Sequence, residues 1–164
     1  MIPANSMHEL AMTLLMTPDK ANFSGKVHGG AILKHLDEVA YACAARYCGG
    51  YAVTKSVDQV SFDRPLYVGE LVTFLASVNF TGRTSMEIGI KVVAEEINRR
   101  ACRHAMTCYF TMVAVDSEGR PKSVPPLEPA DELGRRRFEA ARRRRRLRAE
   151  IKRRQADIKT LTGD

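Results

Sequence analysis

The sequence predicts an α+β fold in which one long helix packs against an antiparallel sheet of five to six strands. Five runs alternate apolar and polar residues with the period of two that is typical of strands, and one run follows helical spacing. No second helical run separates the strands, and short turns join most of them. Because parallel strands need long crossover connections, these observations favour an antiparallel sheet covered by the single helix.

The strand-like runs are residues 8–16, 52–62, 71–80, 84–97 and 103–115. The first run is the weakest, and the second ends just before Arg64-Pro65. In the last three runs the alternation places one apolar set on a single face of each strand. These sets are Val72, Phe74, Ala76, Val78 and Phe80; Met86, Ile88, Ile90, Val92 and Ala94; and Met106, Cys108, Phe110 and Met112.

The helical run precedes the second strand and carries a carboxylate beside its apolar face. At 100° per residue, one continuous arc holds Ile32, Leu33, Leu36, Val39, Ala40, Cys43, Ala44 and Tyr47. Asp37 lies at the edge of this arc, whereas Glu38 lies on the polar side. A carboxylate among small side chains is expected to be partly buried, which suits it to proton transfer. The alternative is a solvated border residue that resembles Glu38.

The tripeptide His28-Gly29-Gly30 immediately precedes the apolar turns of this helix. The first N–H groups of a helix have no intrahelical partner and lie at the positive end of its dipole. They can therefore stabilise a developing oxyanion. A tight turn with close contact between helix and sheet explains the two glycines equally well.

Charge divides the chain into a body, residues 1–126, and a basic helical extension, residues 127–164. The whole chain of 164 residues carries a net charge of +7. Residues 134–164 hold 13 Lys and Arg against 4 Asp and Glu, a net +9, so the remainder sums to −2. Pro125 and Pro126 end the body. The basic charge is thus a property of the extension.

Several classes of protein are disfavoured. No apolar run approaches the roughly 20 residues that span a bilayer, so stable membrane insertion is not expected. The N-terminus lacks a basic segment followed by a long apolar run, so we expect no secretory signal and a cytoplasmic location. The spacing of Cys43, Cys48, Cys102 and Cys108 fits neither a metal site nor a disulfide framework, so reduced thiols are expected.

Several blocks of the sequence resemble the hotdog-fold acyl-coenzyme A thioesterases. They are "TPDKANFSGKVHGGAILKHLDEVAYACAARYCG", "VTKSVDQVSFDRPLYVGELVTF", "TGRTSMEIGIKV" and "FTMVAVDSEGRPKSVPPL". The resemblance implies a long helix wrapped by an antiparallel sheet, with a basic helix after the fold. It also implies homodimers that pair their sheets edge to edge and assemble into a hexamer, a trimer of dimers. The active sites would lie at the dimer interface.

The resemblance further implies that Asn22, in the loop before the helix, and Asp37 of the other subunit form the catalytic pair. Asp37 would act as general base or as nucleophile, and Asn22 would hold the water or the thioester carbonyl. The amide of Gly30 would stabilise the oxyanion. The implied substrate is acyl-CoA, and no cofactor or metal is expected beyond the CoA of substrate and product.

The resemblance also implies that two further segments bind the CoA part of the substrate. Backbone groups on the strand after the helix and after the turn at Gly82 would pair with the pantetheine arm, and arginines would bind the phosphates. The expected residues are Lys55, Ser56, Val57, Arg64, Arg83, Thr84, Ser85, Met86 and Arg144. For each arginine, plain surface charge is the alternative.

Other functions stay open at this point. Hotdog-fold enoyl-CoA hydratases and dehydratases use a histidine and an acid, which His28 and Asp37 could imitate. A non-catalytic binding module could use the five arginines at 142–146. Phe138 is the only aromatic of residues 127–164, so base stacking and nucleic-acid binding are not indicated. Some relatives bind a regulatory nucleotide between subunits, for which Arg99, Arg100 and Arg103 are candidates.

Overall fold

The structure is a computed structural model that describes residues 7–162 of the chain. The expectation of no secretory signal rests partly on residues 1–6, which lie outside the described residues. The chain separates into two compact units, Met1–Pro126 and Leu127–Asp164.

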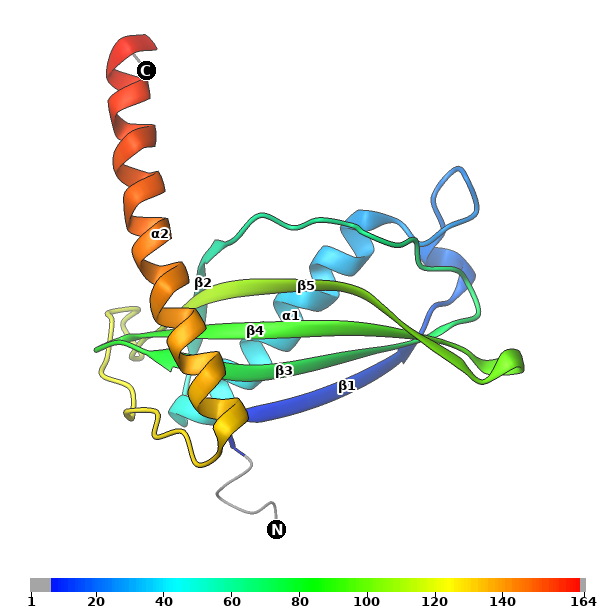
Figure 1. The fold of residues 1–164 in the computed structure, drawn as a ribbon, viewed down its shortest axis with the longest axis horizontal. Coiled ribbons are helices and arrows are strands. Elements are labelled where there is room, and N and C mark those ends of the chain that lie inside the picture. The colour runs from blue at the N-terminus through cyan, green and yellow to red at the C-terminus, as the bar shows by residue number, and fades with distance from the viewer. Residues whose placement is uncertain (1–6, 163–164) are drawn as a thin grey trace. The chain divides into compact units, whose positions relative to one another are not determined.

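The first unit contains one antiparallel sheet with the strand order β1-β3-β4-β5-β2 (Figure 1). The bounds of the strands are β1 Glu9–Leu15, β2 Ala52–Val57, β3 Leu71–Thr81, β4 Ser85–Glu96 and β5 Ala101–Ala114. Short 3-10 turns lie at η2 (Pro18–Lys20) and η3 (Ile97–Arg99). The predicted α+β class with an antiparallel sheet is therefore confirmed, and the weakest predicted strand forms as β1.

Strand β2 is shorter than predicted. The alternation continues to Phe62, but β2 ends at Val57. Its pairing with β5 shifts between Thr54 and Ser56, so Lys55 is an extra residue at a β-bulge. A bulge bends its strand and weakens the ladder beyond it. At this edge of the sheet, residues 58–66 therefore continue as irregular chain, apart from a bond from the Asp58 amide to the Tyr109 carbonyl at 2.9 Å.

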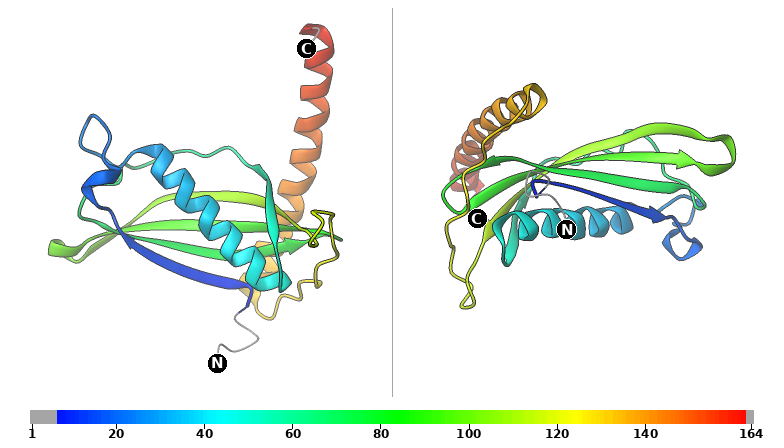
Figure 2. Two further views of the ribbon diagram at one scale, coloured as in Figure 1. Left: turned by 180° about the vertical axis from the view of Figure 1, so that it is seen from behind. Right: turned by 90° about the horizontal axis from the view of Figure 1, so that it is seen from below.

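Helix α1, Gly29–Cys48, lies across one face of this sheet (Figure 2). It ends at Gly49, whose φ of 62° is the left-handed conformation that favours glycine at a helix C-terminus. Its buried side chains are Ile32, Leu36, Val39, Ala40, Cys43 and Ala44. The buried face is narrower than predicted, because Leu33 is 40% exposed and Tyr47 is half-buried.

The core lies between α1 and the sheet. The apolar sets predicted for β4 and β5 are all buried, as are Val72, Phe74, Ala76 and Val78 of β3. Phe80 is half-buried, and the pairing of β3 with β4 shifts at this point. The four cysteines form no disulfide, and burial raises the pKa of the Cys43 and Cys108 thiols to about 12. These two thiols are thus uncharged members of the core at neutral pH.

The second unit is built on helix α2, Glu132–Thr162. Arginines pair with glutamates one turn away at Glu132–Arg135, Glu139–Arg142 and Glu150–Arg154. Such pairs support a solvated helix by a few tenths of a kcal/mol each. Among residues 7–162, no helix is both long and apolar enough to cross a bilayer.

Candidate functional site

The N-terminus of α1 is capped by His28. The ring Nδ1 of His28 accepts a hydrogen bond from the Gly30 amide at 2.9 Å, which satisfies one of the first N–H groups of the helix. His28 therefore acts as the helix cap. The Gly30 amide, predicted as an oxyanion donor, already has a partner in this conformation.

Asp37 lies in the third turn of α1 and faces β2. Its Oδ1 accepts a hydrogen bond from the Thr54 hydroxyl at 2.6 Å. The same hydroxyl lies 3.5 Å from the Met112 sulfur, a much weaker acceptor. Thr54 is the last residue before the bulge at Lys55. The helix and the edge strand thus hold the carboxylate in one orientation.

The predicted partial burial of Asp37 is not found in this chain. Both Asp37 and Thr54 are exposed. The small residues Ala40 and Ala44 pack against the sheet, which leaves the Asp37 side chain at the open edge between α1 and β2. The position at the border of the apolar face is as predicted, but nothing in the described chain covers the carboxylate.

Asn22 closes the hairpin of residues 20–28 that leads into α1. Its Oδ1 accepts hydrogen bonds from the Ser24 amide at 2.9 Å, the Ser24 hydroxyl at 2.8 Å and the Lys26 amide at 3.1 Å. The backbone N–H of Asn22 donates to the Lys26 carbonyl at 2.6 Å. Because the side-chain oxygen is fully used as an acceptor, the side-chain NH₂ group is the end that remains for a ligand.

Asn22 and Asp37 are held by separate parts of the chain. No hydrogen bond joins them, and residues 7–162 contain none between His28 and Asp37 either. Asp37 lies eight positions after Gly29 in the helix, a rise of about 12 Å along the axis. One chain therefore presents the two predicted catalytic side chains at different places.

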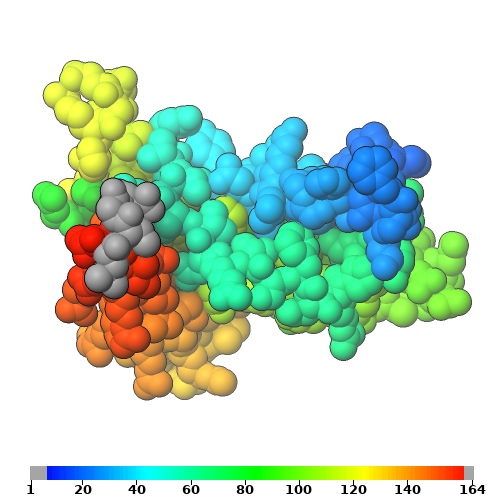
Figure 3. All heavy atoms as spheres, turned by 90° about the horizontal axis from the view of Figure 1, so that it is seen from above, coloured from blue at the N-terminus to red at the C-terminus, as the bar shows by residue number. Residues whose placement is uncertain are grey.

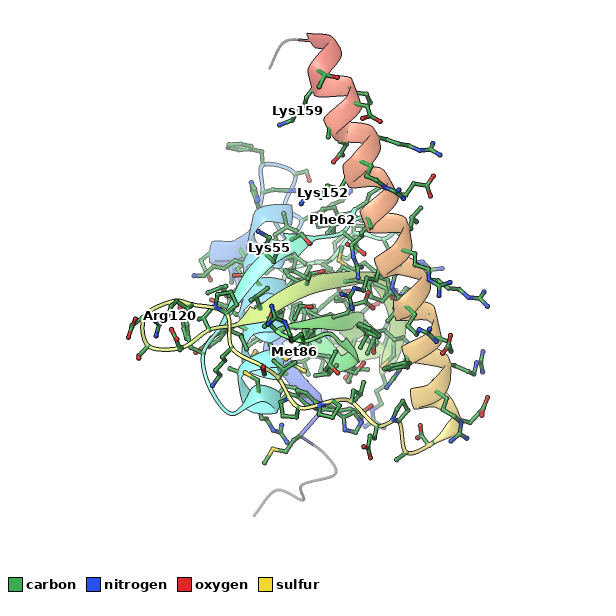
Figure 4. The ribbon with its side chains drawn as sticks, turned by 90° about the vertical axis from the view of Figure 1, so that its left-hand side faces the viewer. Lys55, Phe62, Met86, Arg120, Lys152 and Lys159 are labelled. Atoms are coloured by element: carbon green, nitrogen blue, oxygen red, sulfur yellow. The ribbon has the colours of Figure 1, made fainter. Side chains whose placement is uncertain are left out.

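The residues predicted to bind CoA fall into three groups. Lys55, Ser56 and Val57 are exposed on β2. Thr84 directly precedes β4, and Ser85 and Met86 begin that strand, on the other side of β5. Met86 is only 1% exposed and faces the core, so its side chain offers no contact surface. Figure 4 labels Lys55 and Met86 among the side chains of the sheet. Arg64 and Arg83 are exposed, and Arg144 belongs to α2 in the second unit.

Arg103, one of the three arginines expected as candidates for a regulatory nucleotide, is engaged in an ion pair with Glu70. Its two terminal nitrogens donate to Glu70 at 2.6 and 2.8 Å, and one also donates to the Pro65 carbonyl at 2.7 Å. Glu70 is 5% exposed. Three hydrogen bonds of this guanidinium are thus used within the chain.

Sequence reasoning missed Thr54 as a partner of Asp37. The only signal was its place on the strand that follows the helix, and a threonine on an exposed strand is ordinary. It also missed the pairing of Glu70 with Arg103, because 33 residues separate them and both types are usually solvated.

A single helix laid across a five-stranded antiparallel sheet, with a carboxylate at the open edge between them, defines the hotdog class of proteins expected from the sequence. Residues 24–101 match the family model described as the thioesterase superfamily. The chain belongs to this superfamily. It is 49% identical to the protein VdlD of Helicobacter pylori over 140 residues. The matched region covers 85% of this chain and 80% of VdlD. It is 32% identical to an uncharacterized acyl-CoA thioester hydrolase, YkhA, of Bacillus subtilis, over 76% of this chain and 72% of YkhA.

Solved structures show the same fold at comparable length. The acyl-CoA hydrolase of Staphylococcus aureus, in complex with butyryl-CoA, CoA and CoA disulfide, superposes with a TM-score of 0.84 at 28% identity and covers 96% of each chain. An apo hexameric acyl-CoA thioesterase gives a TM-score of 0.86 at 33% identity, over 92% of this chain and 96% of that one.

Alanine variants of the Staphylococcus aureus enzyme replace an asparagine, an aspartate and a threonine in turn. The aspartate stands 15 positions after the asparagine, and the threonine 17 positions after the aspartate. Asn22, Asp37 and Thr54 have the same spacing in this chain.

Proposed function

We propose that this protein hydrolyses the thioester bond of acyl-CoA and that Asp37 is its reacting carboxylate. The observation that carries the proposal is the contact of 2.6 Å between the Thr54 hydroxyl and Asp37 Oδ1. It leaves the other carboxylate oxygen, Oδ2, open to a water or a substrate at the exposed edge. The matching spacing of an asparagine, an aspartate and a threonine in the Staphylococcus aureus acyl-CoA hydrolase supports the same three positions here.

The chemistry follows from one carboxylate and one amide. As general base, Asp37 takes a proton from water, and the hydroxide adds to the thioester carbonyl carbon. The carbon–sulfur bond then breaks, the thiolate of CoA takes up a proton, and the fatty acid leaves. As nucleophile, Asp37 instead attacks the carbonyl carbon, the carbon–sulfur bond breaks and the CoA thiolate leaves and takes up a proton, which gives a mixed anhydride between Asp37 and the acyl group. Water then hydrolyses the anhydride to the fatty acid and the free Asp37 carboxylate. Both routes use the same side chain.

Asn22 acts in this proposal from a second subunit. The separation of Asn22 and Asp37 within one chain supports a site that is completed by another copy. The side-chain NH₂ of Asn22 would donate to the water or to the carbonyl oxygen. Covering by the second copy would also supply the burial that Asp37 lacks in one chain. The hexameric relative supports a homodimer that assembles into a trimer of dimers.

The Gly30 amide would contribute to the oxyanion site only after it leaves His28. A substrate oxyanion is a stronger acceptor than a neutral imidazole nitrogen, so the exchange is favourable once the carbonyl becomes charged. The CoA part would lie along the exposed β2 residues Lys55, Ser56 and Val57. Arg64, Arg83 and an arginine near Arg144 remain the predicted phosphate contacts.

The second candidate function is that of a hotdog-fold hydratase, and the structure supports it less than the thioesterase. Such an enzyme needs a histidine and an acid that act together on one substrate. Here Nδ1 of His28 is occupied by the Gly30 amide, and Asp37 is bonded to Thr54. The basic extension remains compatible with a role in oligomer contacts or in holding CoA, and the cytoplasmic location remains a prediction.

The direct test measures thiol release from acyl-CoAs of C2 to C16 chain length, with hydration of a C4 enoyl-CoA followed in parallel. We expect release of free CoA from the saturated substrates, and the chain-length profile will define the substrate class. Hydration of the enoyl-CoA with no thiol release at any chain length would replace the proposed thioesterase by the hydratase.

Removal of the Thr54 hydroxyl should slow the reaction moderately. Thr54→Val keeps the shape of the side chain but leaves Asp37 without its donor, a loss of about 1–1.5 kcal/mol for one hydrogen bond. We expect kcat to fall about tenfold. Thr54→Ser retains the hydroxyl and should stay within about threefold of wild type in the same assay. If valine and serine behave alike, the hydroxyl does not orient Asp37.

A further inference from the structure

The hairpin that carries Asn22 is held by hydrogen bonds to one neighbouring segment, residues 65–70. The Val27 amide donates to the Leu66 carbonyl at 2.9 Å, and Lys26 and Tyr67 form an antiparallel bridge. Lys26 is also the residue whose amide donates to Asn22 Oδ1. The orientation of the Asn22 side chain therefore depends on where residues 65–70 place Lys26. Figure 3 shows the two segments side by side on the surface, residues 20–28 in blue and residues 65–70 in blue-green.

Segment 65–70 is fixed in turn by Glu70. Its carboxylate oxygen Oε2 accepts the Tyr67 amide at 2.9 Å, so the acid closes the turn in which Tyr67 lies. The Glu70 backbone also anchors the segment to the end of β1, because its carbonyl accepts the Met16 amide at 2.9 Å. The segment has no helix or strand of its own, so these contacts decide its course.

Arg103 of β5 connects this turn to the sheet. It donates to both carboxylate oxygens of Glu70 and to the Pro65 carbonyl. These bonds therefore hold both the first and the last residue of the segment. Its guanidinium also lies over the Tyr67 ring, 5.7 Å from the centroid. A planar fork that binds a carboxylate through two bonds fixes direction as well as distance. A continuous set of contacts thus runs from β5 through Glu70 and Tyr67 to Lys26 and Asn22.

We propose that Glu70 and Arg103 are positioning residues that set the place of the Asn22 side chain through Tyr67 and Lys26. This inference rests on the proposed function, because it assumes that Asn22 acts on the thioester. Neither Glu70 nor Arg103 touches the substrate in this account. A misplacement of about 1 Å at a reacting group can lower a rate about 100-fold, so loss of the pair should reach kcat without removing any catalytic side chain.

The test is a double-mutant cycle between Glu70 and Asn22 in the full-length protein. Asn22→Ala, Glu70→Gln and the double variant are compared with wild type by kcat and KM for the best acyl-CoA, and thermal midpoints confirm that each variant is folded at the assay temperature. We expect Glu70→Gln to lower kcat about 10-fold to 100-fold, with KM changed less. In the Asn22→Ala background it should have almost no further effect on kcat, because the side chain that it positions is absent.

A purely structural role predicts a different result. In that case Glu70→Gln would lower the thermal midpoint while leaving kcat of the folded enzyme near wild type. Alternatively, the fold-reductions in kcat caused by Glu70→Gln and by Asn22→Ala would multiply in the double variant. Either result would overturn the inference. Glu70→Gln at wild-type kcat would do the same. If Asn22→Ala itself keeps full activity, the proposed catalytic role of Asn22 is wrong. This outcome differs from those that contradict the positioning role of Glu70 and Arg103, so the two proposals are tested separately.

Arg103→Lys provides a second variant in case Glu70→Gln does not fold. Lysine keeps the charge but cannot form the double contact with Glu70 and the bond to Pro65 at once. We expect Arg103→Lys to lower kcat as Glu70→Gln does. In the Asn22→Ala background it should likewise have almost no further effect on kcat. The matched control is Arg120→Lys in the turn after β5, where the exposed Arg120 pairs with Asp116 at 3.1 Å and Glu118 at 2.8 Å. That variant should leave kcat unchanged.

Discussion

Asp37→Asn is expected to lower kcat by about 10²–10⁴, the contribution of a general base. Asparagine has the shape of aspartate and can still accept the Thr54 hydrogen bond through its carbonyl oxygen. It cannot accept a proton from water, and it is a poor nucleophile. Because the variant keeps the contact that orients the side chain, the loss should appear in kcat rather than in stability. Steady-state thiol release together with a denaturation curve measures both.

The control for this variant is Glu38→Gln on the same helix. Glu38 is an exposed carboxylate next to Asp37 in sequence, but it pairs with His35 at 2.9 Å on the polar side. Loss of this charge should change kcat by less than about twofold, because a surface pair of this kind contributes little. If Asp37→Asn stays within a few-fold of wild type, the reacting carboxylate lies elsewhere.

Arg103→Ala is expected to destabilise the protein by about 3–5 kcal/mol, the cost of leaving one member of a buried ion pair without its partner. Glu70 would retain the Tyr67 amide but lose both charge-assisted hydrogen bonds from the guanidinium. Urea denaturation at a fixed protein concentration measures the change, since an oligomer's stability depends on concentration. Arg99→Ala, which breaks an exposed pair, should cost no more than about 0.5 kcal/mol. A loss of less than 1 kcal/mol for Arg103→Ala would mean that the pair is not a major support of the fold.

The same pair predicts how stability depends on pH. Burial by itself raises the pKa of Glu70, but the hydrogen bonds and charge of Arg103 and the Tyr67 amide outweigh it and hold the pKa below the ordinary glutamate value of 4.5. Since the folded-state pKa is the lower one, the stabilisation is fully present above pH 4.5 and is lost as the pH falls through the folded-state pKa. Below pH 4.5 the free energy of unfolding of the wild type should therefore fall with decreasing pH. In Glu70→Gln this fall should be smaller, which denaturation curves measured over a range of pH values will show.

Much of the fold could be predicted from local pattern. The alternation in β3, β4 and β5 placed the core correctly, because side chains of a strand alternate between two faces whatever the partner strand is. The same reasoning extended β2 to Phe62, five residues too far. Alternation cannot reveal a bulge, which depends on pairing with β5 across more than 50 residues.

The candidate site was predictable only in part. Asp37 could be singled out because a carboxylate at the edge of an apolar helical face is unusual, and His28-Gly29-Gly30 because helix starts have strong signals. Resemblance to a family, and not spacing, singled out Asn22. The burial expected for Asp37 was wrong for one chain, since a helical projection shows which face a residue occupies but not what covers it.

By itself the sequence determined the class of the fold, the helix that carries Asp37, the division between body and basic extension, and the likeness to acyl-CoA thioesterases. These properties follow from local periodicity, composition and short motifs. Only the tertiary structure decided that Thr54 orients Asp37, that His28 occupies the Gly30 amide, and that Arg103 binds Glu70 and thereby supports the Asn22 hairpin. Contacts of this kind join residues that are distant in the chain, and their energies depend on a separation of a few ångströms that the order of residues does not specify.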